Sequence, residues 1–247
     1  MRPVGPPCEF NPLPTTPDTP LETSLHELLD AMRPQNGPTT TDAVPLSCPL
    51  CTLTTRSVER QVRAFFAEFI NDPAARIRFR QSRGFCAHHT PLLAELGDAL
   101  AVAILYADLA ERTQERWQAE RGRRFPFGRQ TGGHSAPLAP CPACAAESDA
   151  ERRYTQALAA GLERAEVWSS VESGSGLCVA HAEAVMATAK PAAATRLREL
   201  ELRRLALLQT ELEELIRKND YRFRGETWGA ERDAWQRALQ KLRRPGE

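Results

Sequence analysis

One short pattern, Gly-x-Cys-x-x-His, occurs twice in this chain of 247 residues, as GFCAHH at 84–89 and as GLCVAH at 176–181. A Cys-Pro-x-Cys pair precedes each copy, CPLC at 48–51 and CPAC at 141–144. The offset between the two Cys-Pro-x-Cys pairs is 93 residues, and the offset between the two later motifs is 92 residues. We interpret this repeated order as an internal duplication. The fold must therefore place the cysteines and histidines of both copies.

The spacing within each motif favours metal binding. A Cys-x-x-Cys turn presents two thiolates on one side, and a Cys-x-x-His turn at a helix start presents one sulfur and one imidazole. Two such halves supply the closed Cys₃His set that structural zinc sites use. We expect each sequence unit to close its own site and to hold one of two zinc ions. The eight predicted metal ligands are Cys48, Cys51, Cys86, His89, Cys141, Cys144, Cys178 and His181.

Two alternatives to zinc stay open at this stage. A single Cys-Pro-x-Cys pair also suits a redox dithiol, and a Cys₃His set can hold an iron–sulfur cluster. Four protein ligands leave no open position for water, so we expect structural and not catalytic sites. Alignment of the units selects His89 as the ligand and leaves His88 to a supporting hydrogen bond or to solvent. Cys8, the seventh cysteine, is interpreted as a passive thiol.

Helical periodicity predicts an all-α fold of duplicated units. Apolar residues between Val58 and Ile70 recur on one helical face, and Asp72-Pro73 ends or kinks that helix. The longest predicted helix covers about residues 192–218. The two units are expected to share one core, because a two-helix unit can hardly bury its apolar face alone. In chain order we predict a disordered Pro/Thr-rich tail (1–46), a first Cys-x-x-Cys…Cys-x-x-His helical unit (47–120), a linker (121–140), a second such unit (141–219) and a C-terminal capping segment and helix (220–247).

Two segments outside the repeated units carry patterns of their own. LETSLHELLDAM at 21–32 predicts a short amphipathic helix, either docked or transient. Trp228, Trp235 and Leu239 are expected to share one face of a terminal helix. Between 220 and 226, arginines alternate with aromatic residues. They could grip a phosphate, but pairing with Asp220 or Glu226 is the favoured interpretation.

Charge and hydropathy exclude some partners. Acidic and basic residues balance at 32 each, so no global field favours nucleic acid or an anionic membrane. No apolar run resembles a signal peptide or a membrane span, which predicts a cytoplasmic protein whose thiols stay reduced. We assign no catalytic and no cofactor-binding residues, since no nucleophile beside a base and no phosphate loop is found.

The tandem Cys-Pro-x-Cys and Gly-x-Cys-x-x-His units resemble a bacterial family of uncharacterised proteins of the DUF6062 type, over about residues 47–242. The closing segment RKNDYRFRGETWGAERDAWQRAL at 217–239 shares this resemblance. The resemblance implies two Cys/His metal sites in a helical body and brings no established activity. We expect a zinc-stabilised scaffold or adaptor that binds another protein. The alternatives are a thiol-based redox or metal sensor and, second, a nucleic-acid-binding protein.

Overall fold

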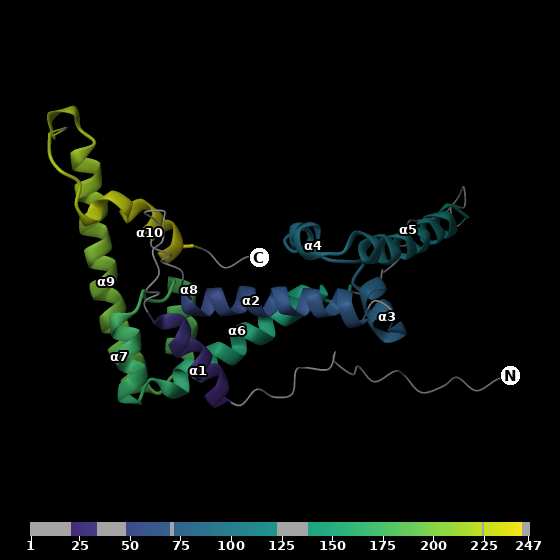
Figure 1. The fold of residues 1–247 in the computed structure, drawn as a ribbon, viewed down its shortest axis with the longest axis horizontal. Coiled ribbons are helices and arrows are strands. Elements are labelled where there is room, and N and C mark those ends of the chain that lie inside the picture. Colours follow the sequence, from purple (N-terminus) through teal and green to yellow (C-terminus); the bar gives the residue numbers. More distant parts are fainter. Residues whose placement is uncertain (1–20, 34–47, 70–71, 123–137, 224, 244–247) are drawn as a thin grey trace, which may run out of the picture. The chain divides into compact units, whose positions relative to one another are not determined.

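The computed structural model describes residues 21–33, 48–69, 72–122, 138–223 and 225–243 (Figure 1). All regular elements of these residues are helices, which confirms the predicted all-α class. In chain order they are α1 (Leu21–Met32), α2 (Pro49–Ala64), the π-helix η1 (Phe65–Phe69), α3 (Pro73–Gln81), α4 (Thr90–Leu96), α5 (Ala99–Gly122), α6 (Pro142–Gly161), α7 (Ala165–Ser173), α8 (Val179–Thr188), α9 (Pro191–Lys218), the 3₁₀ turns η2 (Tyr221–Phe223) and η3 (Ala230–Asp233), and α10 (Ala234–Lys241).

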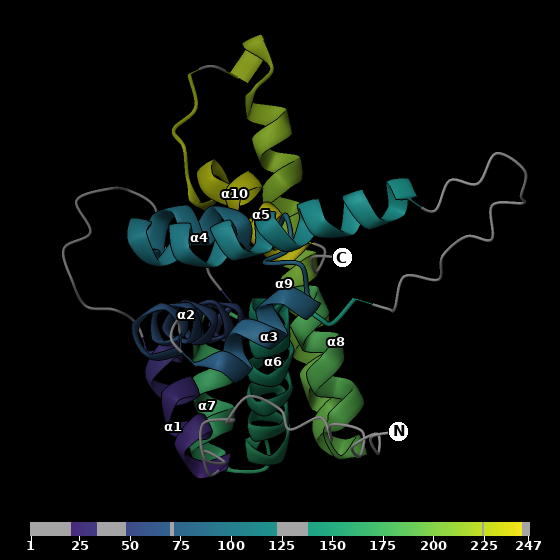
Figure 2. The same cartoon turned by 90° about the vertical axis from the view of Figure 1, so that its right-hand side faces the viewer.

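The larger of two compact units combines Leu21–Val62 with Ala143–Glu247, two stretches that lie far apart in the sequence. Within it, α1 packs against α7, and α2 lies beside α6 (Figure 1, Figure 2). The hydroxyl oxygens of Ser57 on α2 and Tyr154 on α6 are 3.5 Å apart. The largest fully buried apolar side chains of this unit are Leu28, Leu50, Val62, Tyr154, Leu158, Val167, Val185 and Leu197.

Helix α1 confirms the predicted amphipathic helix and shows it docked. Leu25, Leu28 and Met32 lie on one helical face, and all three are buried in the core of the larger unit. Gly161 at the end of α6 leaves room for this contact, because a Cβ there would lie 2.8 Å from the Cδ1 atom of Leu25. The predicted disordered tail (1–46) therefore contains a packed helix, and its residues 1–20 and 34–46 lie outside the described part of the chain.

The smaller unit comprises Arg63–Pro142 and is built around aromatic side chains. Phe79 of α3 is fully buried, and its ring centroid lies 5.8 Å from that of Phe85 and 5.5 Å from that of Tyr106. Helix α3 begins as its sequence predicts, because the carboxylate of Asp72 accepts a hydrogen bond from the Ala74 N–H at 2.9 Å. These contacts order the turn that follows α3, which carries the first Gly-x-Cys-x-x-His motif.

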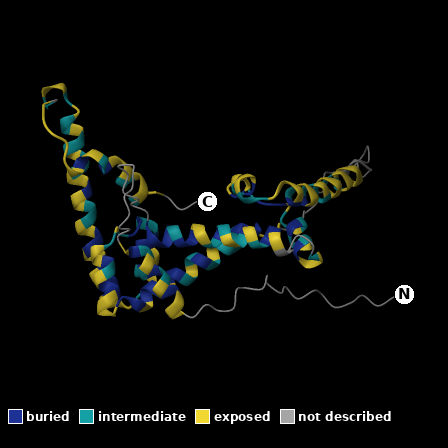
Figure 3. Ribbon diagram, in the orientation of Figure 1, coloured by how far each residue is buried: buried dark blue, intermediate teal, exposed yellow. Residues whose placement is uncertain are grey.

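The C-terminal segment folds back along α9, and its burial differs from the prediction. Helix α9 buries Leu197, Leu200 and Leu208, whereas the large apolar residues of α10 are exposed, and much of α10 has the colour of exposed residues (Figure 3). Trp235 and Leu239 are 52% and 66% exposed. The predicted common helical face with Trp228 is therefore wrong in part, since Trp228 precedes η3 and lies outside α10. Ala234 is the residue that α10 buries.

The compact units do not coincide with the two repeats of the sequence. The repeats at 47–120 and 141–219, and the linker at 121–140, remain predictions. Most of that linker lies outside the described residues, as does Cys8.

Candidate metal centres

Four predicted ligands meet in the larger unit. Cys48 and Cys51 come from the start of α2, and Cys178 and His181 from the start of α8. All four side chains are buried, and one ligand atom from each lies within 4.8 Å of all the others. We call this group the first centre. Its cysteines also belong to the apolar core of the larger unit, so the centre is part of the packed interior.

The distances inside the first centre would allow its four ligand atoms to surround one metal ion. With Zn–S bonds of about 2.3 Å, the sulfurs of such a site lie about 3.8 Å apart. The Sγ atoms of Cys51 and Cys178 are 3.7 Å apart, too far for a disulfide bond. The Nδ1 atom of His181 lies 3.1 Å from each of these two sulfurs and 3.5 Å from Sγ of Cys48. The donor set and its spacing therefore fit a single four-coordinate ion with no open position.

The pKa shifts in the first centre favour a thiolate at Cys178 and a protonated imidazole at His181. Hydrogen bonds from the other two thiols hold the pKa of Cys178 far below its ordinary value, and hydrogen bonds to Cys178 and Cys48 raise the pKa of Cys51. Burial alone would lower the pKa of His181, but hydrogen bonds to Cys178 and Cys48 outweigh it and raise that pKa to about 10. A metal ion that binds these groups must displace their protons.

Local backbone geometry explains why the motif begins with glycine. Gly84 and Gly176 have φ angles of +92° and +87°, in the left-handed region that glycine tolerates best. Each is followed two residues later by a cysteine, Cys86 before the turn that leads to α4 and Cys178 directly before α8. Cys178 is the N-cap of α8, and its carbonyl accepts the Ala182 N–H at 2.9 Å. The positive end of the helix dipole favours thiolate at such positions.

Charged side chains surround the first centre. The carboxylate of Glu151 lies 3.6 Å from Nε2 of His181, the ring atom opposite the one that faces the thiols. A carboxylate at this position orients a metal-binding imidazole in many metal sites. Burial would lower the pKa of the Arg243 guanidinium, but the charges of Cys51 and Cys178 and a hydrogen bond to Cys178 raise it. Arg243 thus offsets negative charge on the sulfurs.

A second group of predicted ligands lies in the smaller unit. Sγ of Cys86 is 3.3 Å and Sγ of Cys141 is 3.9 Å from Nδ1 of His89, and we call these three residues the second centre. His89 is buried, whereas His88 is exposed and its ring contacts that of His89 edge-on. Cys144 follows Cys141 in the first turn of α6 and is half-buried, at the point where the chain enters the larger unit.

The predicted pairing of the half-sites is wrong. The first Cys-x-x-Cys pair meets the second Cys-x-x-His pair, and Cys141 of the second Cys-x-x-Cys pair meets Cys86 and His89. Helix length gives the physical reason. Cys51 lies at the start of α2, whose 16 residues rise about 24 Å in one direction, so the chain does not return before Cys86. Spacing along the sequence located the Cys and His turns that cluster and could not show this crossing.

In the polar segment at 220–226 the acidic residues pair with arginines, as the favoured interpretation predicts. The guanidinium of Arg222 pairs with the carboxylate of Asp220 at 2.6 Å, and that of Arg217 pairs with Glu226. Tyr221 is 75% exposed, whereas the guanidinium of Arg217 lies 4.4 Å from the ring centroid of Phe223. These arginines already have carboxylate partners.

Fold and centres together define an all-helical protein with Cys/His clusters that could hold metal ions. Residues 41–246 match the family described as "Family of unknown function (DUF6062)", and the chain belongs to this family, as the resemblance predicted. The protein described as "Uncharacterized 23.9 kDa protein in xynA 3'region" of Caldicellulosiruptor sp. (strain Rt8B.4) is 29% identical over 177 residues, 71% of this chain and 83% of the relative. No solved structure matches the chain. No helix in the described ranges is long and apolar enough to cross a membrane.

Proposed function

We propose that this chain is a zinc-stabilised helical scaffold or adaptor that binds another protein. The observation that carries the zinc assignment is the first centre, with three sulfurs and one imidazole nitrogen at tetrahedral spacing in a buried site. Cys144 is proposed as the fourth ligand of the second centre, because a Cys-x-x-Cys turn places two sulfurs side by side. Two closed sites leave no position for a reacting water, which supports a structural role for both ions.

The adaptor role is supported by the outward face of α10. Trp235, Leu239 and Leu242 repeat at helical spacing and are 52%, 66% and 56% exposed. An exposed apolar stripe of this kind favours contact with a protein partner. If the stripe binds a partner, W235S/L239S should lose in a pull-down the proteins that the wild-type chain retains. Equal recovery would contradict the adaptor role.

A redox or metal sensor is the second candidate, favoured by exposure at the second centre. Cys86 and Cys144 are only partly buried, whereas the cysteines of the first centre are buried. Partly exposed thiolates are the ones that oxidants reach. Mild oxidant should then release metal from the second centre, and reductant should restore it. Nucleic-acid binding is a further hypothesis. The arginine-rich segment RGRRFPFGR at 121–129 would be its contact, but this segment lies almost wholly outside the described residues, and Arg222 already pairs with Asp220.

Metal analysis with an absorption spectrum, on full-length protein purified without oxygen, tests the proposed function. About two zinc ions per chain and a colourless sample are expected. Iron with inorganic sulfide and a brown colour would overturn the zinc assignment and favour the sensor. A chain purified without any metal, and unable to take up zinc, would overturn both the zinc assignment and the metal-sensor candidate.

A further inference from the structure

The loop between α7 and α8 leads directly into Cys178, and a half-buried guanidinium holds the end of α7 and the start of this loop. Nη2 of Arg204 on α9 donates to the carbonyl oxygens of Val171, Glu172 and Gly174 at 2.7, 3.1 and 3.1 Å. Gly176 passes so close that a Cβ there would lie 3.1 Å from Nη1 of Arg204. The loop thus runs over the guanidinium on its way to the first centre.

A lysine from α10 holds the second half of the same loop. Nζ of Lys241 donates to the carbonyl oxygen of Leu177 at 2.6 Å, and Leu177 directly precedes Cys178. The same Nζ atom pairs with the carboxylate of Glu201, which also accepts from Nη1 of Arg204 at 3.1 Å. The side chains of Glu201 and Lys241 are only 7% and 13% exposed. One buried carboxylate therefore aligns both cations that hold the loop.

These three residues join elements that the sequence keeps apart. Glu201 and Arg204 lie on α9, whereas Lys241 is the last residue of α10. The ammonium group of Lys241 can donate to the loop only while α10 is docked on α9. A buried ion pair is costly to break from one side, because the remaining charge stays unpaired. Undocking α10 would therefore leave Glu201 with one cation and release the carbonyl oxygen of Leu177.

We propose that Glu201, Arg204 and Lys241 form a clamp that positions Cys178 and His181, so that docking of α10 and retention of metal at the first centre reinforce each other. The inference rests on the metal-binding role proposed above, and it adds that docking of α10 regulates how tightly the first centre holds its metal. Linkage makes the effect reciprocal, since docking that tightens metal binding must itself be tightened by the metal. A partner that draws α10 away from α9 would then loosen the metal.

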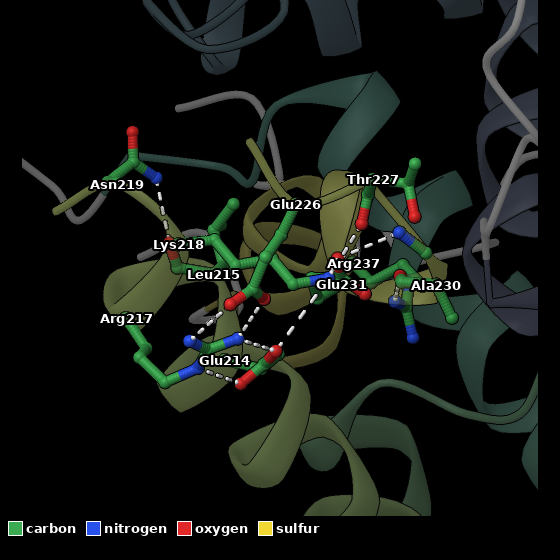
Figure 4. Close-up of polar contacts among 11 residues, drawn as sticks. Glu214, Leu215, Arg217, Lys218, Asn219, Glu226, Thr227, Ala230, Glu231 and Arg237 are labelled. Carbon is green, nitrogen blue, oxygen red and sulfur yellow. Dashed lines mark hydrogen bonds and ion pairs between the residues drawn. The ribbon is translucent and has the colours of Figure 1, made fainter. Parts of the chain in front are cut away.

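The three lysines of the chain provide a matched set of variants. Lys241 belongs to the clamp. Lys218 ties the same C-terminal segment to α9 at its other end, where Nζ donates to Glu231 at 2.6 Å and to the Thr227 carbonyl oxygen at 2.8 Å (Figure 4). Lys190 forms an exposed pair with Glu163. Lysine-to-methionine replacement at each position keeps the length of the side chain and removes one charge.

Zinc-loaded full-length chains would be mixed with a chromophoric chelator, and zinc release would be followed as two phases, one for each centre. K241M should speed one phase about 10-fold or more and leave the other unchanged, which is the usual effect of losing an orienting contact. K190M should match the wild type, and K218M should fall between K190M and K241M. K241R keeps the charge and is expected to restore slow release.

Amide hydrogen exchange of residues 234–241 provides the reciprocal measurement. Removal of zinc from the wild-type chain should speed exchange in α10, an effect that a merely structural ion pair would not produce. The clamp would be overturned if K241M, loaded with two zinc ions, released zinc at the same rate as K190M loaded with two zinc ions. The metal proposal would then stay intact. Exchange in α10 that is insensitive to zinc would do the same. A wild-type chain that binds no zinc would overturn both proposals.

Discussion

Zinc counts in C51A, C178A and the double variant C51A/C178A distinguish crossed pairing from pairing within each sequence unit. In the crossed arrangement both cysteines serve the first centre, where their Sγ atoms are 3.7 Å apart. Each single variant should then keep about one zinc ion, and the double variant should also keep about one. Pairing within units would place the two cysteines in different centres, and the double variant would keep none.

The stability effect can be worked out from the sequence separations. A metal bridge from Cys51 to Cys178 closes a loop of 127 residues, whereas a bridge from Cys51 to Cys86 would close one of 35. Chain-entropy relations for cross-links give about 4.9 and 3.8 kcal/mol for these loops. The crossed bridge therefore constrains the unfolded chain by about 1 kcal/mol more. In zinc-buffered urea unfolding, each single variant should lose about 5 kcal/mol, and the double variant should lose no more, because both replacements remove one bridge.

Metal analysis and urea unfolding of the same samples would decide the question. C8A serves as the control, since Cys8 is not one of the predicted ligands, and it should keep both zinc ions and full stability. A double variant without zinc would refute the crossed arrangement. Additive losses of stability in the double variant would refute it as well.

Three further outcomes are expected. G176A should lose about 1–2 kcal/mol in urea unfolding, because its φ of +87° disfavours any Cβ. G225A, whose Cβ would meet nothing within 4 Å, should lose little. The Gly229 N–H and Lys218 lower the pKa of Glu231 from 4.5 to about 2, so its stabilisation of the C-terminal segment is present above pH 4.5 and lost as the pH falls towards 2. Tryptophan fluorescence should report that loss, and K218M should weaken it. Zinc affinity of the first centre should fall about 100-fold or more per unit as the pH drops below 8, since binding displaces at least two protons, and competition with a zinc-binding dye measures this.

Sequence patterns located the helices well, because burial on one side of a helix leaves a periodic record. Leu197, Leu200 and Leu208 line the buried face of α9 as their spacing predicts. The clamp was missed because Glu201 and Lys241 look like ordinary surface charges. A signal was present nonetheless. Glu201 follows Leu197 by four residues and so lies on the apolar face of α9, where an acidic residue needs a buried partner.

The clustering of Cys and His turns was predictable and their pairing was not, for a physical reason. Cysteine and histidine spacing records the local turn that presents two donor atoms, and all eight predicted ligands lie in such turns or at the start of helices. The combination of turns into one centre depends on the direction in which the intervening helices run, and no short-range pattern carries that information. The nearly equal spacings, 34 residues between Cys51 and Cys86 and 33 between Cys144 and Cys178, even favoured the wrong combination.

Because of the crossed pairing, a metal ion in the first centre would connect two distant stretches of the chain, which a site within one sequence unit would not do. The larger unit is assembled from Leu21–Val62 and Ala143–Glu247, with the smaller unit inserted between them. The first centre takes two ligands from each stretch, so a bound ion would join the stretches directly. Its cysteines lie in the same core as Leu28 of α1 and Leu197 of α9. Metal binding and closure of this core then become one event, because the ion would take ligands from both stretches.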